Sequence, residues 1–236
     1  MKMKKINYKK AINYFVMFSL IFSIVFIIIA MILAPSELNP NEPFVRLKSD
    51  YVLMLLQCIV GVFAMLLPGM LEKKINLEIP SSMMFLYTVF LYCAIYLGEV
   101  RSFYYTVPHW DTILHTFSGA MLGALGFSFI NFLNKTERVP MNLSPSFVAV
   151  FAFCFAITMG VIWEFYEFFA DGILRTNMQK FALESGEQLI GRFALMDTMK
   201  DLVVDAVGAL FISIIGYISV KYKKGWVEKV QLVIRK

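Results

Sequence analysis

The stretch AINYFVMFSLIFSIVFIIIAMILA, from Ala11 to Ala34, contains no charged side chain. About 20 apolar residues in an α-helix are enough to cross the hydrocarbon core of a bilayer. The lysine-rich segment MKMKKINYKK precedes the stretch, and no small-x-small cleavage site of the expected kind follows it. We therefore interpret it as an uncleaved anchor rather than a signal peptide, and it predicts an integral membrane protein.

Further apolar runs follow the anchor, and together they predict an all-α polytopic membrane protein. The chain is 59% hydrophobic and has a mean hydropathy of +0.68, well above the apolar share of an ordinary soluble domain. The predicted spans are about 11–34, 51–71, 79–98, 112–134, 146–170 and 199–220. Since no linker or low-complexity tract separates them, we predict one membrane domain over residues 1–236, with about six transmembrane helices.

The positions of the basic residues predict how the chain is oriented. Lysines crowd the first ten residues, and the C-terminal segment KYKKGWVEKVQLVIRK is also basic. Six spans place both termini on one side, which the positive-inside rule assigns to the cytoplasm. We predict a multi-pass protein of the bacterial cytoplasmic membrane whose basic residues contact membrane lipid and not nucleic acid. The long loop after the fifth span then faces the extracytoplasmic side, and loops of this length are often functional.

The segment DTMKDLVVDAVGAL, from Asp197 to Leu210, carries three aspartates on one helical face where the sixth span begins. Asp197 is expected to cap the helix, with Thr198 as the alternative, and Asp201 is tolerable in the first turn. Asp205 lies about 12 Å further along the axis than Asp197. An unpaired carboxylate in the membrane costs roughly 2.5–3.5 kcal/mol, so we expect Asp205 to be protonated, paired with a cation or bound to a metal ion.

The segment HWDTILHTFSGAMLGALG places Asp111 and His115 at i, i+4 in the fourth span. Gly119 and Gly123 continue the same face, and such a strip of small residues lets a neighbouring helix approach closely. This face, and His115 with it, is therefore expected to point into the helix bundle.

The segment VIWEFYEFFAD places Glu164, Glu167 and Asp171 on one face of the fifth span. A solvated helix end accounts for Asp171. It does not account for Glu164, which lies about two turns deeper in the membrane.

Three explanations of these ionisable groups remain open from the sequence. A structural salt-bridge network would take its counter-charges from Arg101, Arg175, Arg192 and Lys200. A divalent metal ion would be held by His115, Glu164, Asp201 and Asp205, with Glu167 or Asp111 as general base. A proton-coupled path would use the same groups.

With these motifs in view, the chain resembles the YjdF-like family of uncharacterised bacterial inner-membrane proteins. The shared pattern is WDxxxHxxxG at Trp110–Gly119, WExxE at Trp163–Glu167, and DxxxD at Asp197–Asp201 followed by Gly208–Ala209. The architecture is more distantly similar to VanZ-like proteins, small multispan envelope proteins linked to glycopeptide-antibiotic resistance. The resemblance implies an envelope role and no particular reaction.

The sequence hypothesis is an extracytoplasmic acidic and histidine pocket in a metal-dependent enzyme that acts on a lipid or cell-envelope intermediate. The first alternative is a cation- or proton-coupled transporter. The second is an envelope scaffold or resistance factor in which the polar cluster is purely structural.

Overall fold

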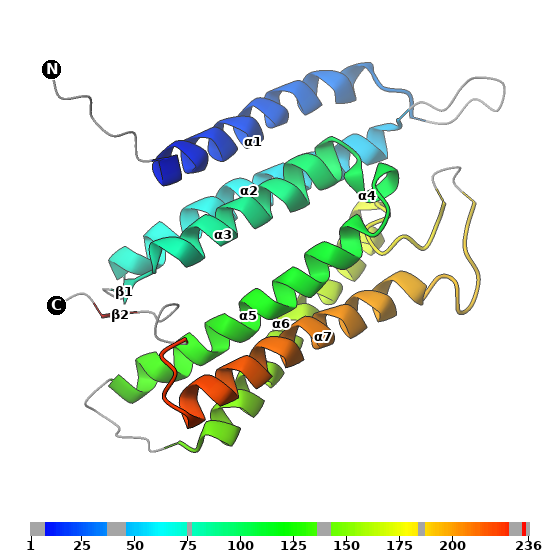
Figure 1. Cartoon of the computed structure of the whole chain (residues 1–236). Coiled ribbons are helices and arrows are strands. Elements are labelled where there is room, and N and C mark those ends of the chain that lie inside the picture. Colours follow the sequence, from blue (N-terminus) through cyan, green and yellow to red (C-terminus); the bar gives the residue numbers. More distant parts are fainter. Residues whose placement is uncertain are drawn as a thin grey trace, which may run out of the picture. The chain divides into compact units, whose positions relative to one another are not determined.

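A computed structural model describes residues 8–36, 46–74, 77–135, 143–183, 187–226 and 233–234. The elements are α1 (Tyr8–Leu33), α2 (Lys48–Lys74), β1 (Leu77–Glu78), α3 (Ser81–Leu91), the π-helix η1 (Tyr92–Val100), α4 (Phe103–Thr106), α5 (Trp110–Lys135), α6 (Pro145–Leu174), α7 (Met196–Lys221) and β2 (Val233–Ile234) (Figure 1). Six helices in the described part of the chain are long and apolar enough to cross a membrane, with α3 and η1 joined as the third. The predicted all-α, six-span architecture is thus confirmed.

The helices are a few residues longer than most of the predicted spans, because helical backbone continues into charged and polar residues outside the apolar runs. The two strands are short and pair antiparallel, with Leu77 opposite Ile234. The sequence did not predict the π-helical turn structure of η1 or the short helix α4.

The chain divides into two compact units, each described here by itself. The first consists of Met1–Ile75 and Ser81–Val107, and the second of Asn76–Pro80 and Pro108–Lys236. The first therefore holds α1, α2, α3, η1 and α4, and the second holds α5, α6 and α7 with the two strands. The single membrane domain and the cytoplasmic location of both termini stay predictions.

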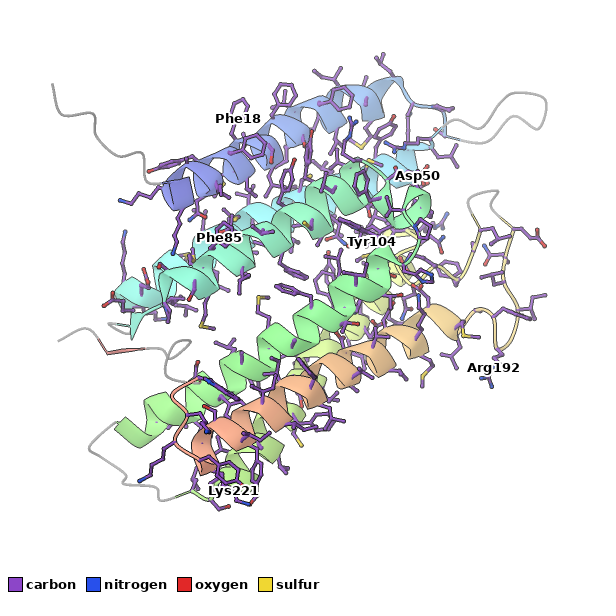
Figure 2. The ribbon with its side chains drawn as sticks, viewed as in Figure 1. Phe18, Asp50, Phe85, Tyr104, Arg192 and Lys221 are labelled. Atoms are coloured by element: carbon purple, nitrogen blue, oxygen red, sulfur yellow. The ribbon has the colours of Figure 1, made fainter. Side chains whose placement is uncertain are left out.

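The first unit buries an apolar core between α1, α2 and the α3–η1 helix. Leu20, Cys58 and Ile95 belong to this core. A hydrogen bond from Thr88 Oγ1 to Asn13 Oδ1, 2.6 Å long, also ties α3 to α1. The outward face of α1 remains apolar, as the 66% exposed side chain of Phe18 illustrates (Figure 2). An apolar outer face is expected where a helix contacts lipid.

The second unit is a bundle in which α5, α6 and α7 each pack against the other two (Figure 1). Glycines set the distance between α5 and α7. A Cβ atom added at Gly119 would lie 2.2 Å from the backbone oxygen of Asp205, and one added at Gly208 would lie 2.0 Å from that of Thr116. The two backbones therefore touch at this crossing, and the predicted packing face at Gly119 is confirmed.

The two ends of this bundle differ in chemistry. The end formed by the C-terminal half of α5 and the start of α6 has an apolar core that includes Phe127 and Ala152. The N-terminus of α6 at this end is capped: Ser144 Oγ accepts a hydrogen bond from Phe147 N, and Pro145 occupies the first turn. At the other end the buried side chains of α6 and α7 include several carboxyl groups, and the candidate site lies there.

Candidate functional site: a buried acidic and histidine cluster

The candidate site is formed by the start of α5, the second half of α6, the start of α7 and the loop that joins α6 to α7. Two helices supply its buried carboxyl side chains: α6 supplies Glu164 and Glu167, with Asp171 further along, and α7 supplies Asp201 and Asp205. The sequence placed each pair on one helical face, and the bundle turns both faces inward. The acidic cluster predicted from the sequence is therefore present in the structure.

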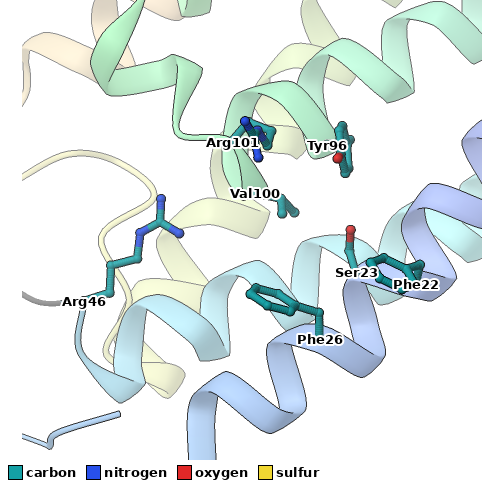
Figure 3. Close-up of a pocket in the computed structure, with 7 residues that line it drawn as sticks. All are labelled: Phe22, Ser23, Phe26, Arg46, Tyr96, Val100 and Arg101. Atoms are coloured by element: carbon teal, nitrogen blue, oxygen red, sulfur yellow. The ribbon is translucent and has the colours of Figure 1, made fainter. Parts of the chain in front are cut away.

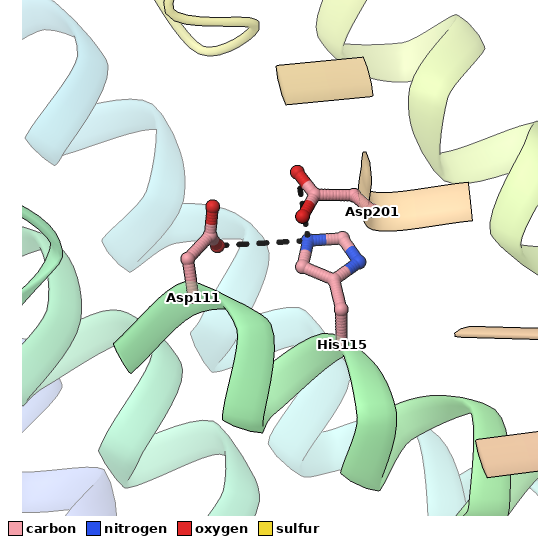
Figure 4. Close-up of side chains that lie close together, drawn as sticks. All are labelled: Asp111, His115 and Asp201. Carbon is pink, nitrogen blue, oxygen red and sulfur yellow. Dashed lines mark ion pairs between the residues drawn. The ribbon is translucent and has the colours of Figure 1, made fainter. Parts of the chain in front are cut away.

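His115 lies at the centre of the site and approaches three carboxylates. Its Nε2 atom is 3.6 Å from Asp111 Oδ1 and 3.8 Å from Asp201 Oδ2 (Figure 4). Its Nδ1 atom is 3.3 Å from Asp205 Oδ2. The two ring nitrogens therefore face different partners, with Asp205 on one side and the Asp111–Asp201 pair on the other.

Asp205, which the sequence left without an ordinary explanation, is paired. Its Oδ2 accepts from His115 Nδ1, and its Oδ1 accepts a 2.9 Å hydrogen bond from Ser118 Oγ. The carboxylate also sits against Gly160, where an added Cβ atom would lie 2.8 Å from Oδ2. A carboxylate on Nδ1 fixes the orientation and tautomer of an imidazole and leaves Nε2 to act as a ligand.

Asp111, His115 and Asp201 could together hold a metal ion. One ligand atom from each lies within 4.8 Å of the other two. Mixed carboxylate and imidazole ligands suit Zn²⁺, Fe²⁺ or Mn²⁺. This group overlaps the predicted ligand set at His115 and Asp201 and adds Asp111, for which the sequence analysis expected the role of general base.

Two carboxylates at the site lack hydrogen-bond donors among the described residues. Asp201 is 2% exposed and its Oδ1 has no partner, while Glu164 is 5% exposed and neither of its oxygens has one. The side chains of Gln179 and Thr198 are near Glu164, but neither forms a hydrogen bond of good geometry with it. Buried oxygens without donors are costly, and a cation or a proton would satisfy them.

Glu167 lies one turn from Glu164 on α6 and has a defined partner. Trp163 Nε1 donates a 2.8 Å hydrogen bond to Glu167 Oε1. Neither Glu164 nor Glu167 belongs to the close group of three possible ligands. Glu164, expected from the sequence to be a ligand, is thus brought into the cluster but not into that group.

Lys180, on the loop after α6, supplies the positive charge of the site. Its Nζ contacts Asp111 Oδ2 and lies 3.3 Å from Asp197 Oδ1. Burial alone would lower the pKa of Lys180, but the carboxylates of Asp111 and Asp197 outweigh burial and raise it above its ordinary value. Lys180 therefore stays charged at every physiological pH.

The backbone around Lys180 is held in an unusual conformation. Lys180 has a φ of 47°, a left-handed value that is unfavourable for a residue with a side chain. Asp171 holds the preceding residues, because its Oδ1 accepts from Thr176 Oγ1 and Met178 N, and its Oδ2 accepts from Gln179 N. Asp171 is therefore a buried anchor of the loop, and its interpretation as a solvated helix end is wrong.

Two further expectations are corrected by the geometry. Helix α7 begins at Met196 and Leu195 is its cap residue, without a side-chain cap. Asp197 therefore lies inside the first turn and pairs with Lys180, and the alternative cap Thr198 accepts a hydrogen bond from Gln179 Nε2 instead.

The arginines and the lysine proposed as counter-charges do not neutralise the cluster. In the part of the chain that the structure describes, no ion pair joins Arg175, Arg192 or Lys200 to it. Figure 2 shows Arg192 on the outer side of the loop. Arg101 belongs to the first unit, where it lines a pocket. The positive partner is Lys180, a residue to which the sequence analysis gave no role.

These features define a multi-pass α-helical membrane protein with an acidic and histidine cluster buried at one end of a helix bundle. The chain belongs to the family described as predicted membrane protein (DUF2238), whose model matches residues 14–222. The resemblance to the YjdF-like family is thereby confirmed, since the two are the same family.

One relative adds to this assignment. A Thermotoga maritima protein described as uncharacterized is 33% identical over 153 residues, which cover 64% of this chain and 69% of the relative. No solved structure matches the chain. The comparisons therefore establish the family and leave the function to be inferred from the site.

Proposed function

We propose that this protein is a metal-dependent membrane enzyme whose metal ion is held by Asp111, His115 and Asp201. The observation that carries the proposal is the close approach of these three side chains, together with the unpartnered Oδ1 of the buried Asp201. An adjacent carboxylate, Asp205, holds the imidazole by its other nitrogen. Metal-ligating histidines commonly have such a partner.

The donor set favours a catalytic over a purely structural ion. One imidazole and two carboxylates leave coordination positions for water and substrate, as catalytic sites require. A divalent ion would supply Lewis-acid activation of a phosphoryl or carbonyl oxygen. In this assignment Asp111 is a ligand and Lys180 neutralises part of the remaining carboxylate charge.

The other two carboxyl groups are available to move protons. Glu167, oriented by Trp163, is assigned the role of general base, as the sequence suggested. Glu164, which the sequence analysis listed as a ligand, is assigned to the substrate side of the site because both of its oxygens lack protein donors.

The location of the site favours a substrate held in the membrane. Asp111 and Asp197 stand in the first turns of their spans, and Asp201 lies one turn deeper. The site therefore begins at the membrane–water interface and extends into the membrane. We propose a lipid head group or a lipid-linked cell-envelope intermediate as substrate, and the bacterial cytoplasmic membrane as the location.

The test is metal analysis of the purified full-length protein, stripped with chelator and then supplied with Zn²⁺, Mn²⁺, Fe²⁺ or Mg²⁺. The wild type is expected to retain one of these ions after desalting. Asp201→Asn should abolish retention, and Asp205→Asn should weaken metal affinity by about 10–100-fold, because it removes only the support of His115. Glu187→Gln, at an exposed acidic position of the loop, is the matched control and should bind as the wild type does. Wild-type protein that retains none of the four ions would end the proposal.

A cation- or proton-coupled transporter is the second candidate, and Glu164 is the observation that favours it. A carboxyl group that is 5% exposed, within a span and without a donor is typical of ion pathways in membrane proteins. Proton flux in liposomes that Glu164→Gln abolishes would support transport. A scaffold, in contrast, would show neither metal retention nor flux, and Asp201→Asn would change only its stability.

A further inference from the structure

The first unit contains a pocket that is unrelated to the acidic cluster. It has a volume of about 420 Å³ and lies between α1, the residue stretch before α2 and the end of η1. Ligand sites commonly have volumes of about 300–1,000 Å³. Its walls combine aromatic rings (Phe22, Phe26 and Tyr96) with two guanidinium groups, Arg46 and Arg101 (Figure 3).

The π-helix places two of these side chains on the same wall. Arg101 N donates a 2.9 Å hydrogen bond to Tyr96 O, five residues earlier. In a regular α-helix, residues five apart point about 140° away from one another, whereas the i→i+5 closure brings Tyr96 and Arg101 to one face. Irregular turns of this kind are frequent at functional sites.

Arg46 is held in place on the opposite wall. Its Nη2 donates to Ser102 Oγ and its Nη1 contacts Met54 Sδ at 3.8 Å. Ser102 itself has a left-handed φ of 61°, a strained conformation for serine. Figure 3 shows the Arg46 side chain extending towards the end of η1. The two contacts engage two of its five N–H donors.

The described part of this unit does not neutralise the positive charge of the pocket with an ion pair. Neither Arg46 nor Arg101 forms an ion pair within the described ranges 8–36, 46–74 and 77–107 of this unit. Arginine forks bind phosphate and carboxylate in a bidentate manner. Two of them facing one cavity therefore indicate an anionic ligand.

The position along the membrane identifies the kind of anion. Arg46 precedes the span that begins at Lys48, and Arg101 directly follows the span that ends at Val100. Both guanidiniums are thus at the level of lipid head groups. Phe22 and Phe26 lie within the first span and are 62% and 58% exposed, so the apolar wall opens sideways towards lipid chains.

We propose that this pocket binds the phosphate head group of an anionic membrane lipid between Arg46 and Arg101, with an acyl chain against Phe22 and Phe26. This site is independent of the proposed metal centre, because it shares no residue with it. It fits a phosphate-bearing amphiphile better than a soluble phosphate, since Phe22, Phe26 and Val100 add an apolar wall to the two guanidinium groups.

The experiment measures binding of fluorescent phosphatidylglycerol to the full-length protein in detergent micelles. Unlabelled phosphatidylglycerol, phosphatidylcholine and inorganic phosphate serve as three separate competitors. Unlabelled phosphatidylglycerol should displace the probe at a concentration about tenfold lower than phosphatidylcholine, and inorganic phosphate should not displace it. Equal competition by the two lipids, or displacement by inorganic phosphate, would overturn the proposal.

Variants locate the binding within the protein. Replacing Arg46 and Arg101 by Gln should weaken phosphatidylglycerol binding by about tenfold or more. Arg101→Lys, which keeps the charge but loses the fork, should weaken it less and is the variant to use if the double replacement does not fold. The matched control replaces Arg175 and Arg192, two exposed arginines of the second unit, and should bind as the wild type does. Unchanged binding in both Arg101→Lys and the double variant would refute the assignment.

Discussion

Replacing Gly208 with alanine tests the packing that holds the acidic cluster together. The added Cβ would lie 2.0 Å from Thr116 O and 3.1 Å from Ala120 N. A carbon atom normally approaches a carbonyl oxygen to about 3.3 Å, so α5 and α7 must separate by about 1.3 Å. The backbone oxygen cannot rotate away as a side chain would. Overpacking of this kind costs about 1–3 kcal/mol, and we expect Gly208→Ala to lower the free energy of unfolding by that amount.

The same displacement should reach the site. Gly208 is less than one turn from Asp205, whose Oδ2 is 3.3 Å from His115 Nδ1. A separation of about 1 Å would break this hydrogen bond, since donors and acceptors beyond about 3.5 Å interact weakly. Gly208→Ala is therefore expected to lose metal retention along with stability.

Thermal unfolding of the purified protein in detergent measures the loss of stability, and metal analysis measures the loss of metal retention. Gly172→Ala is the matched control, because a Cβ added there would meet no atom of the described protein within 4 Å other than the neighbouring backbone of its own helix. It should leave metal retention unchanged and stabilise the helix slightly, as alanine has a higher helix propensity than glycine. If Gly208→Ala unfolds at the same temperature as Gly172→Ala, the inference that the backbones of α5 and α7 touch at Gly208 is wrong.

Two further predictions concern the loop between α6 and α7. Lys180→Gln leaves Asp111 and Asp197 without their cation and is expected to lower the free energy of unfolding by about 1–3 kcal/mol. The pKa of Lys180 is raised in the folded state. The stabilisation that Lys180 gives the protein is therefore complete below the ordinary pKa of lysine, and it is lost only as the pH rises through the higher pKa of the folded state. Chemical unfolding should therefore give the same difference between wild type and variant at about pH 7 and about pH 9, and a smaller difference at the higher pH would contradict the assignment. Alkaline phosphatase fused after Ile190 should be active and a fusion at the C-terminus inactive, as the positive-inside rule requires; the reverse result would place the acidic cluster on the cytoplasmic side.

Most of the secondary structure could be predicted from the sequence, because membrane spans are set by local composition. A long uncharged run such as Ala11–Ala34 must satisfy its backbone hydrogen bonds internally in lipid, and a helix does so. Helical periodicity also predicted which acids share a face, since residues at i, i+4 stay together whatever surrounds them. The membership of His115, Asp201 and Asp205 in one site followed from these local rules and from the alternating direction of successive spans, which brings the polar ends of these helices to the same side of the membrane.

Two residues at the site that the sequence analysis did not single out, Ser118 and Lys180, carried weaker signals. Ser118 lies three residues after His115 on the same helical face, and that spacing could have indicated it as a partner. Lys180 had no such signal, because its contact with Asp111 spans 69 positions and depends on the loop that Asp171 anchors. Loop conformations of this kind are set by tertiary hydrogen bonds and not by local pattern.

The sequence by itself thus determined that this protein spans the membrane and that acids and one histidine share its buried helix faces. Only the tertiary structure decided which atoms meet. The closeness of α5 and α7 at Gly119 and Gly208 sets the contacts of His115, and that closeness depends on how two backbones pack. The pocket between Arg46 and Arg101 likewise depends on a π-helical register, because a single change in hydrogen-bond spacing turns a side chain to another face.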